Sequence, residues 1–189
     1  MKTIITTIVA TILSSTALIA GTYNVDTSHS NVGFKVKHMM ISNVIGKFDK
    51  YNGSFEYDEK TNTLEMLRGV IQVASINTAN KKRDTHLKSD ELFNAEKFPQ
   101  IKFVLEKTDS DYAYGKLTMH GVTKNVKLDL ENNGMVKDPW GNTRVGLELT
   151  GKLSRADYGI TWNKGLELGG VVVGDTIKLD IQIEGILAK

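Results

Sequence analysis

The chain has 189 residues, of which 40% are hydrophobic and 24% are charged, and its formal net charge at pH 7 is +2. This composition is typical of one globular domain, and the interspersed basic and acidic residues argue against a role in binding nucleic acid. Cysteine is absent, which excludes a disulfide framework and a lipid-anchored N-terminal cysteine.

The first twenty residues predict a cleavable secretory signal, residues 1–20. Lys2 supplies the positive charge, and the apolar run from Ile4 to Ile19, with Thr and Ser mixed in, is too short for a stable membrane anchor. Cleavage after Ala20 and cleavage after Ala17 both leave the first strand pattern intact. We therefore expect an exported protein, in the periplasm or secreted, with no stable membrane insertion and a mature domain over 21–189.

The stretch from Asp26 to Phe48 carries the clearest pattern, because apolar side chains alternate with polar ones from Asn31 onward. This period of two predicts a strand with one buried and one solvated face. The side chains of the buried parity are Val32, Phe34, Val36 and His38, and Met39, Met40 and Ile41 follow at once. An imidazole and two flexible thioethers at the inner end of a strand are typical of the wall and lip of an apolar pocket. A core histidine with methionines as gap fillers is the alternative.

Further strands are predicted over 44–57, 64–76, 100–107, 112–119, 122–130, 143–153 and 176–187, with a loop bracketed by 132–134 and 138–142. The polar segment 80–93 lacks a period of two, and it predicts a short helix over 81–87 and a helical turn over 90–93. About eight antiparallel strands with hairpin spacing predict an all-β barrel or sandwich. Long strands with several glycines favour an eight-stranded barrel, which is wide enough to hold one small ligand.

The sequence offers little catalytic chemistry. Its four histidines, His29, His38, His86 and His120, are the only side chains that titrate near neutral pH without a shift, and no HExxH, GxSxG, GxGxxG or P-loop motif occurs. We predict no catalytic residue, no metal and no cofactor. The polar residues Arg83, Asp84 and His86 predict either a solvated helix face or a rim over the barrel mouth that binds a head group.

Five motifs, taken in order, resemble the YceI-like family of exported lipid-binding proteins, which are described as polyisoprenoid-binding. They are DTSHSNVGFKVKH (26–38), ISNVIGKF (41–48), RDTHLKSDELFNAEKFPQIKF (83–103), GKLTMHGVTKNVKLDL (115–130) and LSRADYGIT (153–161). Tyr158 stands where phenylalanine is common in the family. The resemblance implies an extended lipocalin-like barrel whose tunnel holds a polyisoprenoid or fatty-acid-type ligand, a homodimer, and no shared enzymatic activity.

We therefore predict a periplasmic carrier of one long-chain amphiphilic lipid, held in an extended eight-stranded antiparallel barrel with one helical insertion. A lipid-modifying enzyme that uses His38 and a side-chain-filled barrel that serves as an interaction module are the alternatives. The predicted head-group contacts are His38, Arg83, Asp84 and His86. The predicted ligand-binding residues are Phe34, Val36, His38, Met39, Met40, Phe55, Ile71, Val73, Phe93, Phe103, Leu105, Leu117, Met119, Leu147, Leu149 and Trp162.

Overall fold

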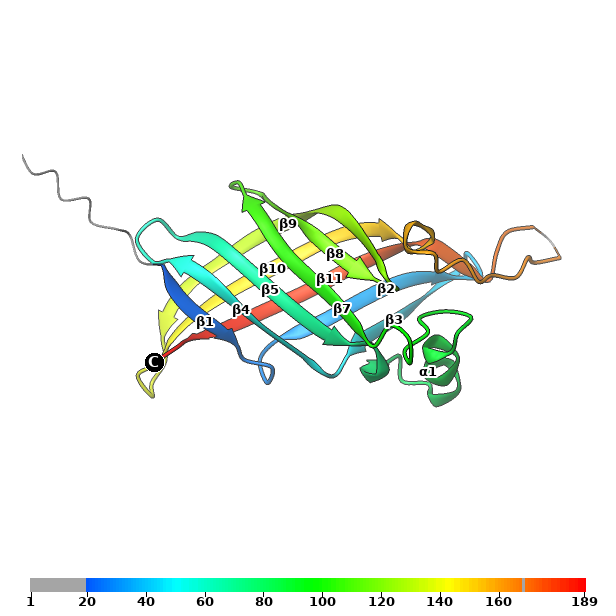
Figure 1. Ribbon diagram of the computed structural model, residues 1–189, viewed down its shortest axis with the longest axis horizontal. Helices are drawn as coiled ribbons and strands as arrows, with labels where there is room; N and C mark the ends of the chain where they lie inside the picture. Colours follow the sequence, from blue (N-terminus) through cyan, green and yellow to red (C-terminus); the bar gives the residue numbers. More distant parts are fainter. Residues whose placement is uncertain (1–19, 168) are drawn as a thin grey trace, which may run out of the picture.

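The computed structural model describes residues 20–167 and 169–189, so that the predicted signal segment lies outside the described residues except for Ala20. These residues form a barrel of antiparallel strands with one short α-helix beside one of its ends (Figure 1). The strands are β1 (Gly21–Val25), β2 (Asn31–His38), β3 (Ser42–Phe48), β4 (Tyr51–Asp58), β5 (Thr63–Gln72), β6 (Ile76–Asn77), β7 (Gln100–Thr108), β8 (Tyr112–Met119), β9 (Val122–Lys137), β10 (Thr143–Ser154) and β11 (Val173–Leu187). The helix α1 spans Lys81–Lys88, and short 3₁₀ turns lie at Val73–Ser75 and Ala156–Tyr158.

Three of the barrel's long strands are interrupted. β1 and β2 both pair with β11, so together they form one long bent strand. β3 pairs with β2 and β4 pairs with β1, so β3 and β4 form a second long bent strand beside the first. β5 and β6 continue one another in the same way, because β5 pairs with β4 and β6 with β3. With β7 to β11 these make eight strands joined in chain order, and β11 closes the ring on β1. The predicted all-β, eight-stranded antiparallel barrel with one short helix is confirmed.

Three predicted elements differ in their boundaries, and one of them is the strand predicted over 64–76, which the 3₁₀ turn Val73–Ser75 divides into β5 and β6. The strand predicted over 44–57 is broken at Asp49 and Lys50, where the chain bends between β3 and β4. The loop predicted to start at 132–134 is instead part of β9, which continues to Lys137. The register there shifts between Gly146 and Leu147, a β-bulge that absorbs one extra residue of β9 without ending the strand.

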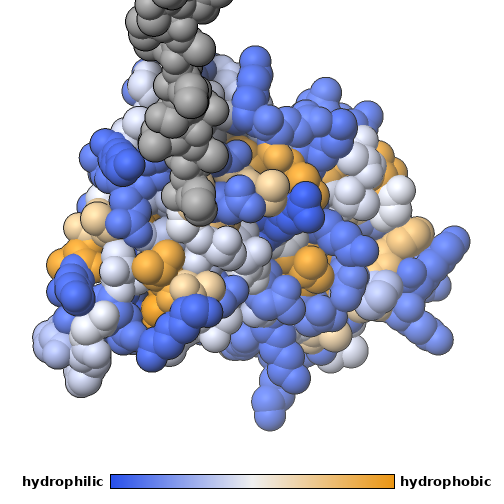
Figure 2. Space-filling model, turned by 60° about the vertical axis from the view of Figure 1, so that its left-hand side comes forward, coloured by the Kyte–Doolittle hydropathy of each residue, from blue (hydrophilic) through white to orange (hydrophobic). Residues whose placement is uncertain are grey.

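One end of the barrel, where β1 meets β11, is filled by side chains. The rings of Tyr23 and Phe55 stack with their centroids 5.2 Å apart, and Tyr57 lies edge-on to Tyr23. Gly185 makes this packing possible, because a Cβ there would lie 2.3 Å from the Phe55 ring. The buried residues of this packed end are Tyr23, Phe55, Tyr57, Leu64, Leu67, Leu105, Ala113, Leu128, Val145, Leu147 and Leu149. The outer surface on this side is mainly hydrophilic, with small separate apolar patches (Figure 2).

The opposite end is covered by α1 and the loops around it (Figure 1). The helix starts at Asn80, whose side chain accepts a hydrogen bond from the Arg83 backbone N–H, and it buries none of its own residues. Leu92, on the segment that follows, joins a second apolar cluster with Ile101 and Met119. Within the described ranges, no helix is both long and apolar enough to cross a bilayer. The helix therefore serves as a cover for the barrel rather than as part of its core.

Candidate functional site

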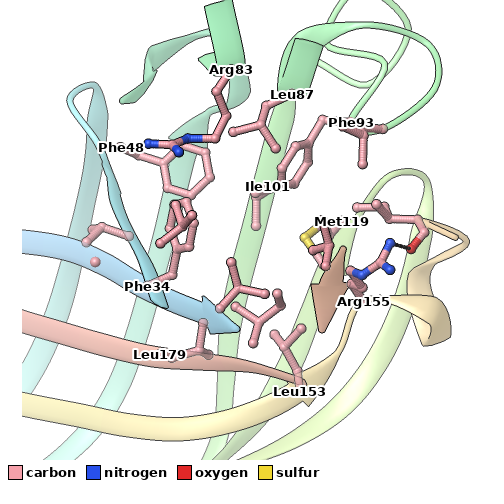
Figure 3. A pocket seen from close by; sticks show the side chains of 18 of the residues that line it. Phe34, Phe48, Arg83, Leu87, Phe93, Ile101, Met119, Leu153, Arg155 and Leu179 are labelled. Atoms are coloured by element: carbon pink, nitrogen blue, oxygen red, sulfur yellow. Dashed lines mark hydrogen bonds between the residues drawn. The ribbon is translucent and has the colours of Figure 1, made fainter. Parts of the chain in front are cut away.

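The covered end of the barrel encloses a cavity of about 270 Å³ between the inner faces of the strands and the segment that carries α1 (Figure 3). A second cavity of about 90 Å³ lies next to it, toward the packed end. The residues that line both cavities are Val32, Ile71, Leu117, Leu179 and Ile181. Because they share these walls, the two cavities adjoin inside the barrel, and the smaller one ends against the packed core; we call the two together the tunnel.

Alternating residues of two paired strands build one wall of the tunnel. Phe34 and Val36 on β2 lie opposite Leu179 and Ile177 on β11, and all four side chains line the larger cavity. Gly46 on β3 lets the Phe34 ring lie across that strand, since a Cβ at Gly46 would come within 2.4 Å of the ring. The alternation in the sequence thus becomes a continuous apolar surface.

The ionisable residues among those that line the larger cavity are all basic or imidazole side chains: Lys37, His38, Arg83, His86 and Arg155. No carboxylate of the described residues belongs to this wall. A cationic group in an apolar, water-poor site interacts more strongly with an anion than it would in water. The cavity therefore combines an apolar body with a polar rim suited to an anionic or hydrogen-bond-accepting head group.

Arg83 on α1 is held over the cavity by a fixed set of hydrogen bonds (Figure 3). Its Nε donates to Thr78 Oγ1 at 2.7 Å and its Nη2 to the Thr78 carbonyl at 2.8 Å. The Thr78 N–H and hydroxyl donate in turn to Asp84 Oδ1 at 2.9 and 2.5 Å. Asp84, a predicted head-group contact, is therefore off the cavity wall and positions Arg83 through Thr78. Within the described part of the chain, Arg83 Nη1 makes no hydrogen bond.

Arg155 is a buried, charged wall residue that was not among the predicted ligand-binding residues. It is only 5% exposed, its Nε donates to the Gly174 carbonyl at 3.1 Å, and its Nη1 donates to the carbonyls of Ile160 and Trp162 at 2.8 Å each. Burial lowers the pKa of this guanidinium, and Asp175, 3.5 Å from Nε, opposes that shift. Nη2 has no hydrogen bond to any described residue. Arg155 lies just past the end of β10, where the alternation of buried and exposed residues no longer predicts the direction of a side chain.

The two predicted head-group histidines have different surroundings. His86 Nε2 lies 2.7 Å from Glu91 Oε2, and the imidazole lies edge-on to Trp162 with ring centroids 4.7 Å apart. His38 ends β2 on the cavity wall, and no described side chain hydrogen-bonds to its ring. The His38 ring is therefore available to a ligand, whereas His86 is already engaged at Nε2.

We expect His38→Ala to weaken ligand binding about 5- to 150-fold, which corresponds to a hydrogen bond of roughly 1–3 kcal/mol. The thermal midpoint of the ligand-free protein should change little, because no hydrogen bond joins the imidazole to a described residue. Both quantities are to be measured on protein stripped of lipid. A lowered midpoint with unchanged affinity would show that His38 is a structural residue.

The other predicted residues divide according to their depth in the barrel. Those on the walls of one or both cavities are Phe34, Val36, Ile71, Phe93, Phe103, Leu117, Met119, Leu149 and Trp162. Those buried off the walls are Phe55, Val73, Leu105 and Leu147. Met39 and Met40 are 41% and 56% exposed and form the turn between β2 and β3, outside the walls. Alternation tells which face a residue occupies but not how far along the barrel the cavity extends.

A separate ionic cluster lies outside the tunnel. Asp26, His29 and Glu184 bring three potential metal-ligand atoms within 4.8 Å of one another. Arg144 supplies the positive charge that a metal ion would otherwise bring to these carboxylates. Its Nη1 donates to Asp26 at 2.9 Å and to Glu184, and its Nε donates to Asp138 at 2.7 Å. Hydrogen bonds from Ser28, His29 and Arg144 hold the pKa of Asp26 well below its usual range. Asp26 therefore stabilises the fold at neutral pH and loses this contribution as the pH falls through its lowered pKa.

Comparison with protein-family models matches residues 23–185 to the YceI-like domain. A UPF0312 protein of Staphylococcus aureus (strain MSSA476) is 36% identical over 163 residues, which cover 86% of this chain and 95% of that protein. The crystal structure of the Campylobacter jejuni YCEI protein superposes with a TM-score of 0.71 at 35% identity, covering 87% of this chain and 96% of the other. A polyisoprenoid binding domain from Saccharophagus degradans superposes with a TM-score of 0.67 at 16% identity, covering 90% and 99%.

Proposed function

We propose, from the premise that the chain belongs to the YceI-like domain family, that it is an exported carrier which holds one long-chain amphiphile with an anionic head group in its barrel. The observation that carries this proposal is the apolar tunnel with basic side chains at its covered end. Export to the periplasm rests on the leader-like segment 1–20, and a homodimer remains a prediction from the family resemblance.

The tunnel's walls suit a long hydrocarbon chain better than a compact polar molecule. Each methylene transferred from water into such a wall stabilises the complex by roughly 0.8 kcal/mol before ordering costs. The Saccharophagus degradans domain is described as polyisoprenoid-binding, and at 16% identity it shares the fold alone. We therefore infer a long-chain ligand of the polyisoprenoid or fatty-acid type from the cavity itself.

The polar contacts favour a carrier over an enzyme. A general acid–base site needs a partner that orients or exchanges protons with the histidine, and no carboxylate of the described residues shares the cavity wall with His38. Arg83 and Arg155 each present a guanidinium nitrogen that has no hydrogen bond within the described ranges. Both nitrogens are suited to donate to a carboxylate or phosphate.

Organic extraction of protein purified from the exported fraction is expected to release a long-chain compound in a stoichiometric amount. Native mass spectrometry should show the corresponding added mass on the folded protein. A clean extract from well-folded protein, with no uptake of added lipid, would contradict the carrier proposal.

Arg83→Met is expected to weaken binding of a carboxylate- or phosphate-headed lipid about 10- to 150-fold, because a hydrogen bond to a charged group contributes roughly 1.5–3 kcal/mol. Binding of a neutral alcohol of the same chain length should change far less. Lys82→Met is the matched control, since Lys82 is the exposed preceding residue of the same helix and lies off the wall. Equal losses for the charged and neutral lipids would show that Arg83 does not contact the head group.

A further inference from the structure

The turn between β2 and β3 exposes apolar side chains at the covered end of the barrel. Met39, Met40 and Ile41 are 41%, 56% and 84% exposed, and Ile45 on β3 is 68% exposed. We call Met39, Met40 and Ile41 the β2–β3 tip. Exposed apolar side chains that cluster, rather than occur singly, mark surfaces that meet an apolar partner.

The backbone of this tip does not call for methionine. The Ile41 N–H donates to the His38 carbonyl at 3.2 Å, and φ is +49° at Met39 and +62° at Met40. Positive φ at both central residues is the pattern of a type I′ turn, for which Asn-Gly is strongly preferred. Two methionines in left-handed conformations cost stability that Asn-Gly would avoid. Their presence at an exposed turn indicates that the side chains are used for something other than folding.

The tip borders the opening of the tunnel. His38 and Val44, on either side of it in the hairpin, both line the larger cavity. The Met39 N–H donates to the carbonyl of Val172 at 2.8 Å, and Val172 is also a wall residue. A ligand that leaves between these wall residues therefore passes the β2–β3 tip.

The outer face of the same strands carries three lysines in register, with Asp180 two residues from Lys178 on the same face. Lys152, Lys178 and Lys35 lie directly opposite one another on β10, β11 and β2, and all three are exposed. Like charges in register across a sheet are destabilising, and no described carboxylate forms a salt bridge with them. The whole hairpin 31–48 contains lysines but no aspartate or glutamate. This row of lysines complements an anionic surface.

We propose that the protein docks on an anionic lipid bilayer through the β2–β3 tip, with the lysine row facing the lipid head groups. A single small apolar insertion gives only weak, reversible membrane binding, and a basic patch beside it adds a second attraction. Such docking would let a lipid pass between bilayer and tunnel without crossing water. This inference rests on the proposed carrier function only for the lipid that would be transferred, because the docking surface itself lies outside the cavity.

The test is flotation of the full mature protein with vesicles of phosphatidylcholine and phosphatidylglycerol. The wild-type protein is expected to float with these vesicles, and less with vesicles of phosphatidylcholine alone. Met39→Asn combined with Met40→Gly should reduce vesicle binding at least about tenfold, because two exposed apolar side chains are lost. The thermal midpoint of this variant should stay the same or rise, because Asn-Gly suits the turn. Each replacement of Lys35 or Lys178 by Gln should lower binding about fivefold.

Trp140→Ser is the control for nonspecific apolar contact. Trp140 is 81% exposed in the turn between β9 and β10, near the packed end. Its loss should leave flotation unchanged. Absence of wild-type flotation, or equal loss with Trp140→Ser, would overturn the proposal. The proposal would also be overturned if replacing the tip converted a dimer to a monomer, as measured by light scattering, without loss of vesicle binding. The tip would then bind a second copy of the chain. Protein that floats but yields a clean extract would retain the docking surface and contradict the carrier function.

Discussion

Replacing Leu179 with tryptophan is expected to divide the tunnel and to shorten the lipid chain that the protein accepts. Leu179 lines both cavities where they adjoin, so an indole there is expected to separate the larger cavity from the smaller one. Each methylene that no longer reaches the inner cavity loses roughly 0.8 kcal/mol, about fourfold in affinity. Affinities measured for a series of fatty acids should match wild type for short chains and fall progressively for longer ones.

Gln182→Trp is the matched control for this experiment. Gln182 lies on the same strand, β11, but its side chain is exposed and belongs to neither cavity. The same bulky side chain on the outer face should leave the dependence on chain length unchanged. A uniform loss of affinity at every chain length for Leu179→Trp would mean that ligands do not extend past this point.

Arg155→Met is expected to be the most destabilising single change considered for the site. Removing the guanidinium leaves the carbonyls of Gly174, Ile160 and Trp162 without their donor, and each buried acceptor left unsatisfied costs roughly 1–3 kcal/mol. For a chain of this size the thermal midpoint should fall by about 10 °C. Arg155→Lys should restore little, because one ammonium group cannot reproduce the planar fork that reaches three carbonyls.

Lys152→Met is the control for Arg155, since Lys152 is an exposed cation on β10, three residues earlier in the chain. Its thermal midpoint should stay within a degree or two of wild type, as is usual for surface substitutions. Comparable midpoints for the two methionine variants would show that the bonds of Arg155 to the backbone do not stabilise the fold. The fluorescence of Trp162, whose carbonyl Arg155 holds, offers a local readout of the same loss.

The period of two in the sequence predicted the strands, because alternation reports which face of each strand is buried, and the glycines of the long strands favoured a barrel over a sandwich. Phe34 and Phe55 both occupy the inner face, yet one lines the cavity and the other is packed against Tyr23. Depth along the barrel depends on the register of strands distant in sequence, which a local pattern does not contain. This is why Leu105 and Leu147 lie in the packed end although their parity is that of wall residues.

The polar part of the site was harder to predict for a different reason. Arg155 reaches the wall from a 3₁₀ turn after β10, and Asp84 is directed to Thr78 by a local hydrogen bond. Neither arrangement follows from a strand or helix period. Met39 and Met40 illustrate the reverse case, because they continue an inner-face run but the chain turns at their position. Turn geometry determined the outcome for Arg155, Met39 and Met40, and a local hydrogen bond determined it for Asp84.

The packed end of the barrel also carries both described ends of the chain, which has a practical consequence. The Ala188 N–H donates to the Thr22 carbonyl at 2.8 Å, and the C terminus lies far from α1 (Figure 1). β11 runs 15 residues from the covered end, where the tunnel opens, to the packed end, a length of roughly 50 Å. A fluorescent reporter or a surface linker attached at Lys189 would therefore leave the mouth unobstructed. Immobilised by its C terminus, the protein would present the cavity opening to the sample, an arrangement that suits binding assays of the proposed carrier function.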